Sequence, residues 1–403
     1  MKHLIKISLL LISTYISGQN IKTVQLRPLS SNQFAPIVKL GEILELSFDD
    51  LDADNKQYQY KIEHMTHDWK PSNLLSNQYI QGFNQNYFTN ITNSFNTLQD
   101  YTHYSIKIPN ENTTLTKSGN YLISVLDENL EVVFTRKCVF YEDLTTVGVA
   151  VFRSRNVATL NKQQTVQFVV NHPKVSIINP TQEIKVTLLQ NNNWNININN
   201  IEPHFIKPNQ LVYNHTTKTN FWGGNEFLNF DNKYIRSTNI NIAKTERLDV
   251  VHNYLYLNEP RAYKPYSYNP DINGQFIVRT LDAQDEDTEA DYATVHFSLK
   301  SEKLNFKEIF VHGAFNNFEL TDENKMEYNE NEKTYTTSLQ LKQGFYNYGF
   351  ATKDQNGNVS LTEIDGSFYQ TENEYTAIIY YKPFGEIYDR VIGVGFGFFD
   401  QNR

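Results

Sequence analysis

The chain has 403 residues, 36 of them basic and 45 acidic, and its formal net charge of −9 excludes an electrostatic site for nucleic acid or an anionic membrane surface. Its 26 Tyr, 26 Phe and 3 Trp exclude an extended disordered chain, and its length predicts about two to three domains. Its one cysteine, Cys138, excludes an intramolecular disulfide and a cysteine-based metal site.

Residues 1–19 have the pattern of a secretory signal peptide. Lys2 and Lys6 form a short basic region, the stretch 7–16 is mostly apolar, and a small Ser-Gly pair then offers a cleavage point. The apolar stretch is too short to span a bilayer, and no later segment reaches about eighteen apolar residues. We therefore expect export to the periplasm without a membrane span. A buried first strand or helix is the alternative interpretation.

Period-two alternation of apolar and polar residues recurs along the rest of the chain and predicts β-strands almost throughout. The 48 Asn residues suit the many turns that such a protein needs. The predicted fold class is all-β, with tandem immunoglobulin-like or early-set β-sandwich domains. The predicted strands are 43–48, 58–63, 101–108, 120–126, 132–140, 147–152, 165–170, 184–189, 234–242, 276–281, 293–299, 308–311, 335–341, 345–350, 375–381 and 391–399.

Two polar joints divide the expected domains. Residues 142–146 separate an N-terminal β-sandwich domain, 20–143, from a second one, 144–300. The charged run at 300–303 precedes a C-terminal early-set-like β-sandwich domain, 301–403.

No stretch carries the pattern of a catalytic or metal site. Gly393, Gly395 and Gly397 lie inside an apolar strand, which favours close backbone packing over phosphate binding. His64 and His67 face opposite ways in an extended chain, so a shared metal is disfavoured against a structural role. The acidic stretch 282–291 lacks EF-hand spacing and is interpreted as a solvated loop rather than a calcium site. We expect no catalytic residue, no cofactor and no metal.

One loop, residues 257–275, has the composition of a contact surface. Its prolines keep it extended and out of sheet interiors, and tyrosine and arginine supply anchoring area at interfaces. The predicted partner interface is Arg261, Tyr263, Tyr266 and Tyr268. The alternative is a long connection that packs on its own domain.

The segment 311–318, Val-His-Gly-Ala-Phe-Asn-Asn-Phe, resembles the opening of early-set modules attached to starch- and glycogen-acting enzymes. Those modules often have Trp where this chain has Phe318, so the sugar site does not carry over. A carbohydrate-binding accessory protein of polysaccharide uptake remains an alternative function, and a secreted glycosidase or esterase is a further one.

Taken in order, the motifs resemble the plug protein family of the type IX secretion system of Bacteroidetes-type bacteria, over nearly the whole mature chain. They include Tyr58-x-Tyr60-x-Ile62-x-His64, Asp68-Trp69-x-Pro71-Ser72, Tyr79-Ile80-x-Gly82-Phe83, Phe221-Trp222-Gly223-Gly224-Asn225-Glu226-Phe227, Asp365-Gly366-Ser367-Phe368 and Tyr388-Asp389-Arg390-Val391. The resemblance implies a non-enzymatic protein at the inner face of the outer membrane. There it would bind the outer-membrane translocon barrel, as a monomer within a larger complex, and close its periplasmic opening when no substrate passes.

Overall fold

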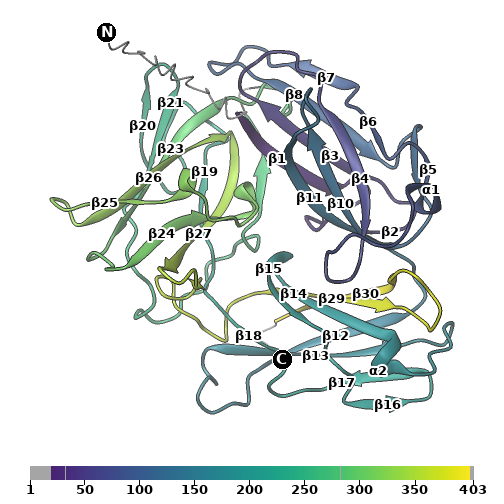
Figure 1. The fold of residues 1–403 in the computed structure, drawn as a ribbon. Coiled ribbons are helices and arrows are strands. Elements are labelled where there is room, and N and C mark those ends of the chain that lie inside the picture. The colour runs from purple at the N-terminus through teal and green to yellow at the C-terminus, as the bar shows by residue number, and fades with distance from the viewer. Residues whose placement is uncertain (1–19, 32, 282, 400–403) are drawn as a thin grey trace, which may run out of the picture.

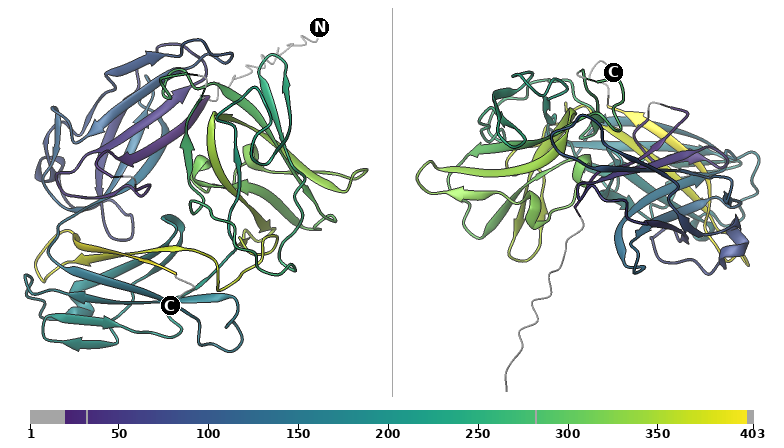
Figure 2. Two further views of the ribbon diagram at one scale, coloured as in Figure 1. Left: turned by 180° about the vertical axis from the view of Figure 1, so that it is seen from behind. Right: turned by 90° about the horizontal axis from the view of Figure 1, so that it is seen from above.

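The computed structural model describes residues 20–31, 33–281 and 283–399, which form mostly β-strands and thus confirm the prediction of a β protein. The sheets are grouped into three lobes that lie in a triangle (Figure 1; Figure 2, left). The expected signal peptide at 1–19 lies outside the described residues. Helical segments in the described part are α1 (Ser76–Tyr79), α2 (Pro180–Glu183), η1 (Ala314–Asn316) and η2 (Asp322–Asn324), and none there could cross a membrane as a helix.

The first lobe, residues 20–142, has two sheets around one core. Alternate side chains point to the same face of a strand, so the period-two pattern places Phe48 opposite Tyr58 and Tyr60 in the shared interior. A short pair, β5 (Ile80–Gly82) and β9 (Thr113–Leu115), flanks it. The sheets have the strand orders β1 (Ile21–Pro28), β3 (Leu44–Asp50), β8 (Thr102–Ile108), β7 (Asn90–Asn93), and β2 (Ile37–Lys39), β11 (Val132–Tyr141), β10 (Gly119–Leu126), β4 (Gln59–Met65), β6 (Gln85–Tyr87).

The second lobe combines residues 144–222 with residues 374–398. The C-terminal strands β29 (Glu374–Tyr381) and β30 (Arg390–Phe398) complete a sheet whose other members are β14 (Ile184–Gln190) and β15 (Asn193–Asn199), in the order β15, β14, β29, β30. The facing sheet has the order β12 (Thr146–Arg153), β13 (Gln163–Asn171), β17 (Gln210–Tyr213), β16 (Phe205–Lys207), with β18 (Asn220–Trp222) also paired to β13. Tyr375, Ile379 and Ile392 belong to this core.

The third lobe, residues 228–364, is inserted between the two parts of the second. Its core extends from Phe230 to Ile364 and includes residues on both sides of position 300. One sheet is β20 (Ile242–Arg247), β21 (Val251–Leu255), β23 (Tyr292–Lys300), β26 (Thr334–Lys342), β25 (Glu327–Asn329). The other is β19 (Leu228–Asp231), β27 (Gly344–Asp354), β22 (Phe276–Val278), with β24 (Lys307–His312) and β28 (Val359–Ser360) also on β27.

The strand pairing therefore groups the chain differently from the boundaries expected at residue 300. The expected domains 144–300 and 301–403 each contribute strands to both of the last two lobes, since β14 pairs with β29 and β23 pairs with β26. The charged joint at 300–303 is a connection within the third lobe, between β23 and β24. The charged composition of 300–303 predicted a joint between domains, but hydrogen bonds between strands far apart in the sequence decide which strands share a core.

Of the predicted strands, only 234–242 is wrong, since it overlaps β20 at Ile242 alone and otherwise runs as a loop. Ile235 is buried there, while Tyr234 is 42% and Ile240 is 53% exposed, so the segment is fixed by one anchor rather than by a pleated face. Asparagine also has the expected role in turns, because Asn191, Asn192 and several other asparagines have positive φ.

Candidate functional site

The predicted contact loop 257–275 is fixed at its base by two of the four residues singled out. The Arg261 guanidinium donates to the Asp365 carboxylate at 2.9 Å and to the Glu226 backbone oxygen at 2.8 Å. The Tyr266 hydroxyl donates to the Glu226 carboxylate at 2.5 Å. Arg261 and Tyr266 thus hold the loop to the linkers between the second and third lobes. This agrees with the alternative interpretation of the loop as a connection that packs on its own protein.

The other two residues of the predicted interface face outward. Tyr263 is 97% exposed, and Tyr268 is 55% exposed while its hydroxyl donates to Glu372 at 3.1 Å. An exposed aromatic ring on an anchored loop loses little side-chain entropy on contact. The structure brings Arg261, Tyr266 and Tyr268 together around Glu226 and Glu372, and it leaves the Tyr263 side chain in solvent.

Carboxyl groups gather beneath this loop. Burial, together with the nearby Glu226 and Glu372, raises the pKa of Asp271 to about 7. Burial also raises the pKa of Glu226, although the Tyr266 hydroxyl opposes the shift. Each acid accepts hydrogen bonds from the loop or the linkers. Asp271, for example, accepts from the backbone N–H groups of Phe227 and Asn273. The acidic cluster therefore holds the loop in place.

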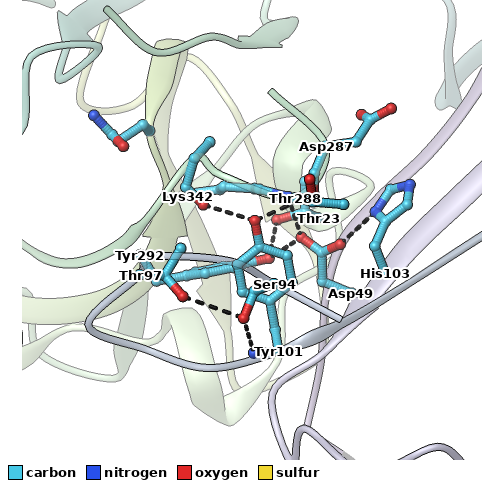
Figure 3. A network of polar contacts seen from close by, with 12 residues as sticks. Thr23, Asp49, Ser94, Thr97, Tyr101, His103, Asp287, Thr288, Tyr292 and Lys342 are labelled. Atoms are coloured by element: carbon cyan, nitrogen blue, oxygen red, sulfur yellow. Dashed lines mark hydrogen bonds and ion pairs between the residues drawn. The ribbon is translucent and has the colours of Figure 1, made fainter. Parts of the chain in front are cut away.

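A buried polar network joins the first lobe to the third, with Asp49 of β3 at its centre (Figure 3). One carboxylate oxygen accepts from the Lys342 ammonium at 2.8 Å and from the Tyr292 hydroxyl at 2.6 Å, and the other lies 2.7 Å from His103 Nδ1. The side chains of Asp49 and Lys342 are each about 1% exposed. Burial would raise the pKa of Asp49, but Lys342 and His103 together hold it below its usual value.

The Lys342 ammonium has interaction partners in both the first and the third lobe. It donates to the Asp287 backbone oxygen at 2.6 Å and lies 4.2 Å from the centroid of the Tyr101 ring. The Tyr101 hydroxyl in turn donates to the Ala290 backbone oxygen at 2.8 Å. A buried charge with this many partners is stable only when both lobes stay in place, so the network fixes their relative position.

The first and second lobes also meet through a mixed interface. Ile37 and Val139 of the first lobe share an apolar cluster with Leu189 and Ile378 of the second. The polar contacts around it are Tyr380 to Asn120 at 2.9 Å, Asp389 to His67 at 3.2 Å and Arg390 to Glu142 at 2.7 Å. Trp69 and Trp194 meet edge to face with centroids 4.6 Å apart.

A groove of about 910 Å³ separates the second and third lobes. Amide side chains from β15 and its turn, such as Asn195 and Asn197, line it together with the rings of Trp222, Phe227 and Phe318. The linkers beside the groove are hydrogen-bonded to each other and to the second lobe: the Asn373 amide donates to the Gly223 backbone oxygen, and the Gln164 amide donates to the Thr371 backbone oxygen.

The histidines, glycines and cysteine considered as possible site residues pack within or between the lobes. His64 is 3% exposed within the first lobe, whereas His67 contacts Asp389 of the second, so the two do not share a ligand. A β-carbon at Gly395 would lie 2.6 Å from the Val147 backbone oxygen, which confirms close packing of β30 on β12. Cys138 is buried, and burial raises the pKa of its thiol well above the ordinary value.

One acidic cluster has metal-like spacing among the described residues. Carboxylate oxygens of Asp50, Asp52 and Asp54 lie within 4.8 Å of one another. The Lys56 ammonium lies between them, at 2.9 Å from Asp50 and 3.3 Å from Asp54, and also contacts Asp52. The lysine supplies the positive charge that a metal would otherwise bring, so this cluster is a turn with its own counterion.

The network around Asp49 could not have been found from the sequence. Asp49 and Lys342 are 293 positions apart, and each is one charged residue at the end of an ordinary strand pattern. The only local sign of the network is that each charged residue follows an apolar residue in a predicted strand. A charge that is buried in a strand needs a partner, because burial removes its hydration.

Comparisons with known proteins agree with this architecture. A crystal structure of a hypothetical protein from Parabacteroides merdae ATCC 43184 is similar to the chain with a TM-score of 0.90 and 30% identity, covering 94% of this chain and 97% of that one. A serine-rich repeat protein from Streptococcus agalactiae aligns with a TM-score of only 0.14 and 9% identity, and carries no argument. A comparison with curated proteins gives no match.

The fold and its contacts define a mostly β protein with three lobes and an anchored aromatic loop. Residues 21–142, the first lobe, match the family described as the type 9 secretion system plug protein, first domain. The first lobe therefore carries the first domain of the type 9 secretion system plug protein family, as its motifs indicated. That is a family of secretion-system plugs rather than of enzymes.

Proposed function

We propose that this chain is the periplasmic plug of a type 9 secretion system. It binds the outer-membrane translocon and closes the periplasmic opening while no substrate is in transit. The observation that carries the proposal is the family match of the first lobe at residues 21–142. The chain itself acts without catalysis.

The mechanics of the fold support this role. A stopper must keep its shape against a wide pore, and buried contacts join the first lobe to both of the others, by ion pair at Asp49–Lys342 and by apolar packing around Val139. We assign each lobe, with two sheets around one core, to the immunoglobulin-like or early-set β-sandwiches. Such sandwiches resist deformation because side chains of the two facing sheets interdigitate. Such a body closes an opening without any moving chemical step.

The location follows from the same proposal. The leader pattern at 1–19 and the family together support the periplasm, at the inner face of the outer membrane, for a monomer within a larger complex. The predicted partner interface consisted of Arg261, Tyr263, Tyr266 and Tyr268. We now propose that only the two exposed residues, Tyr263 and Tyr268, contact the translocon.

The test is deletion of the gene followed by measurement of the uptake of a large hydrophilic antibiotic. We expect uptake to rise several-fold and to return to the parental level when the gene is restored. A tagged chain should also recover the translocon barrel from detergent extracts. Unchanged permeability together with no recovered barrel would refute the plug.

A carbohydrate-binding accessory function is the second candidate, and one observation favours it. The groove between the second and third lobes combines amide side chains with Trp222, which is 49% exposed. Amides and an open aromatic face suit sugar hydroxyls and ring faces. Immobilised glucans that retain the wild-type chain but not a Trp222→Ala variant would support this function, and no retention of either would dismiss it.

A further inference from the structure

A cavity of about 240 Å³ lies where the three lobes meet. The first lobe contributes Arg27 from β1 and Arg136 with Lys137 from β11. The second contributes the Asn192 to Asn195 stretch at the start of β15, and the third contributes residues beside β22 and η1. No motif of the sequence points to this position, because each lobe supplies only part of the lining.

The three basic side chains are held by aromatic rings. The Arg27 guanidinium lies 5.2 Å from the centroids of both Phe34 and Phe276, and it donates to the Phe276 backbone oxygen. The Lys137 ammonium lies 4.9 Å from the centroid of Trp69 and 5.8 Å from that of Trp194.

Arg136 follows the same pattern. Its guanidinium lies 5.3 Å from the centroid of Phe134 and donates to the Thr135 backbone oxygen at 2.9 Å. Cation–π contacts hold a charge in position while leaving N–H donors unused. The three side chains therefore bring more donors to the cavity than the protein satisfies.

The cavity lacks the negative charge that would balance these cations. Within the described lining, Glu319 is the one carboxylate against three bases, and its own oxygen accepts from the Asn317 amide at 2.7 Å. Arg27, Arg136 and Lys137 make no ion pair with a described residue. Partly buried cations are ordinarily paired, because desolvation penalises an unpaired charge.

The pKa values of these basic groups agree with the lack of nearby negative charge. Burial lowers the pKa of Arg27 to about 10 and that of Arg136 to about 10, and it also lowers the pKa of Lys137. Glu319 opposes the shift only at Arg136. Arg27 and Arg136 remain charged near neutral pH, so their positive charges exceed the single Glu319 carboxylate in the periplasmic range.

We infer that this cavity is a binding site for a small oxyanion, a carboxylate or phosphate compound, that joins the three lobes. Pockets for drug-sized ligands begin at about 300 Å³, so the volume suits a smaller molecule. Carboxylate and phosphate oxygens match the fork of donors on a guanidinium. The amides of Gln25, Asn193 and Gln275, one from each lobe, line the same space and can donate to the remaining oxygens.

The test is isothermal titration calorimetry of the full mature chain with sodium citrate and, separately, with inorganic phosphate, each against a chloride buffer of equal ionic strength. We expect saturable binding of at least one anion at a single site, and the anion that binds separates carboxylate from phosphate chemistry. Arg136→Gln should weaken that binding at least tenfold. Arg155→Gln, at an exposed position in the second lobe, is the matched control and should leave it unchanged.

Near-UV circular dichroism establishes that each variant is folded before titration. If Arg136→Gln is unfolded, Arg27→Gln takes its place, since Arg27 reaches the cavity from a different strand. The inference is overturned if neither anion binds the wild-type chain beyond chloride. It is also overturned if the folded cavity variant binds as tightly as wild type, or if Arg155→Gln weakens binding equally.

Discussion

Asp49 and Lys342 show at the scale of single residues how the lobes are held. Their ion pair is buried from both sides, whereas ion pairs such as Lys333 with Glu302 lie in solvent. Exposed pairs contribute little because water screens them, but removing one partner of a buried pair leaves a desolvated charge.

We therefore expect Lys342→Met to lower the free energy of unfolding by about 3 kcal/mol, measured by urea denaturation. Lys333→Met is the matched control and should change it by less than about 0.5 kcal/mol, since that ammonium is exposed. Equal effects of the two substitutions would contradict the assigned role of the network.

Asp49 also predicts a dependence of stability on pH. The pKa of its carboxyl is lowered in the folded state, so its contribution is present above the unfolded pKa and is lost as pH falls through the folded pKa. The unfolded pKa is about 3.9. The difference in unfolding free energy between wild type and Asp49→Asn should therefore be present at about pH 5 and shrink below about pH 4. A constant difference down to pH 2 would contradict the shift.

At the scale of elements, β30 approaches β12 so closely that the valines of β12 leave no room for a side chain at Gly395 or Gly397. A β-carbon at Gly395 would meet the Val147 backbone oxygen at 2.6 Å, whereas one at Gly148 would make an ordinary 3.5 Å contact with Val169. We expect Gly395→Val to destabilise the chain by about 3 kcal/mol, because overpacking moves backbone. Gly148→Ala is the control, and thermal or urea unfolding is the measurement. A neutral Gly395→Val would show that the strands can separate freely.

The loop 257–275 combines an anchored base with an open tip, and that division sharpens the interface prediction. We expect Tyr263→Ala with Tyr268→Ala to weaken binding to the purified translocon at least tenfold, because exposed tyrosines supply contact area. Tyr266 is left in place, since its hydroxyl bonds the Glu226 carboxylate. Phe384→Ala, at another fully exposed aromatic, is the control. Equal translocon affinity with an unchanged melting temperature would leave the loop as purely structural.

At the scale of the whole molecule, the chain returns to the second lobe after building the third. A fragment of residues 20–300 lacks β29, which pairs with β14, and β30, which pairs with β29. It also lacks β26 and β27 of the third lobe. We expect this fragment to lose native near-UV circular dichroism and resistance to proteolysis beyond residue 142. Residues 20–142, which have their own core, should remain folded. A protease-resistant second lobe in the longer fragment would contradict the discontinuous arrangement.

Much of the fold was accessible from the residues alone. Strands such as β4 and β29 were predicted because alternation is a local property. β15 was missed, because its run of asparagines has the composition of a turn although it pairs with β14. Of the predicted interface, Tyr263 is exposed and Arg261 is anchored to Asp365, a difference that depends on residues more than a hundred positions away.

The sequence by itself determined the β class, the positions of most of the longer strands, the lack of disulfides within the chain and, through its motifs, the plug family of the first lobe. These depend on local patterning, on composition and on ordered motifs. Only the tertiary structure decided that β29 and β30 complete the second lobe, that Asp49 meets Lys342, and that Arg27 and Arg136 line one cavity. Strand pairing and charge pairing are set by the burial of groups far apart in the chain, and no local pattern encodes which distant partner satisfies them.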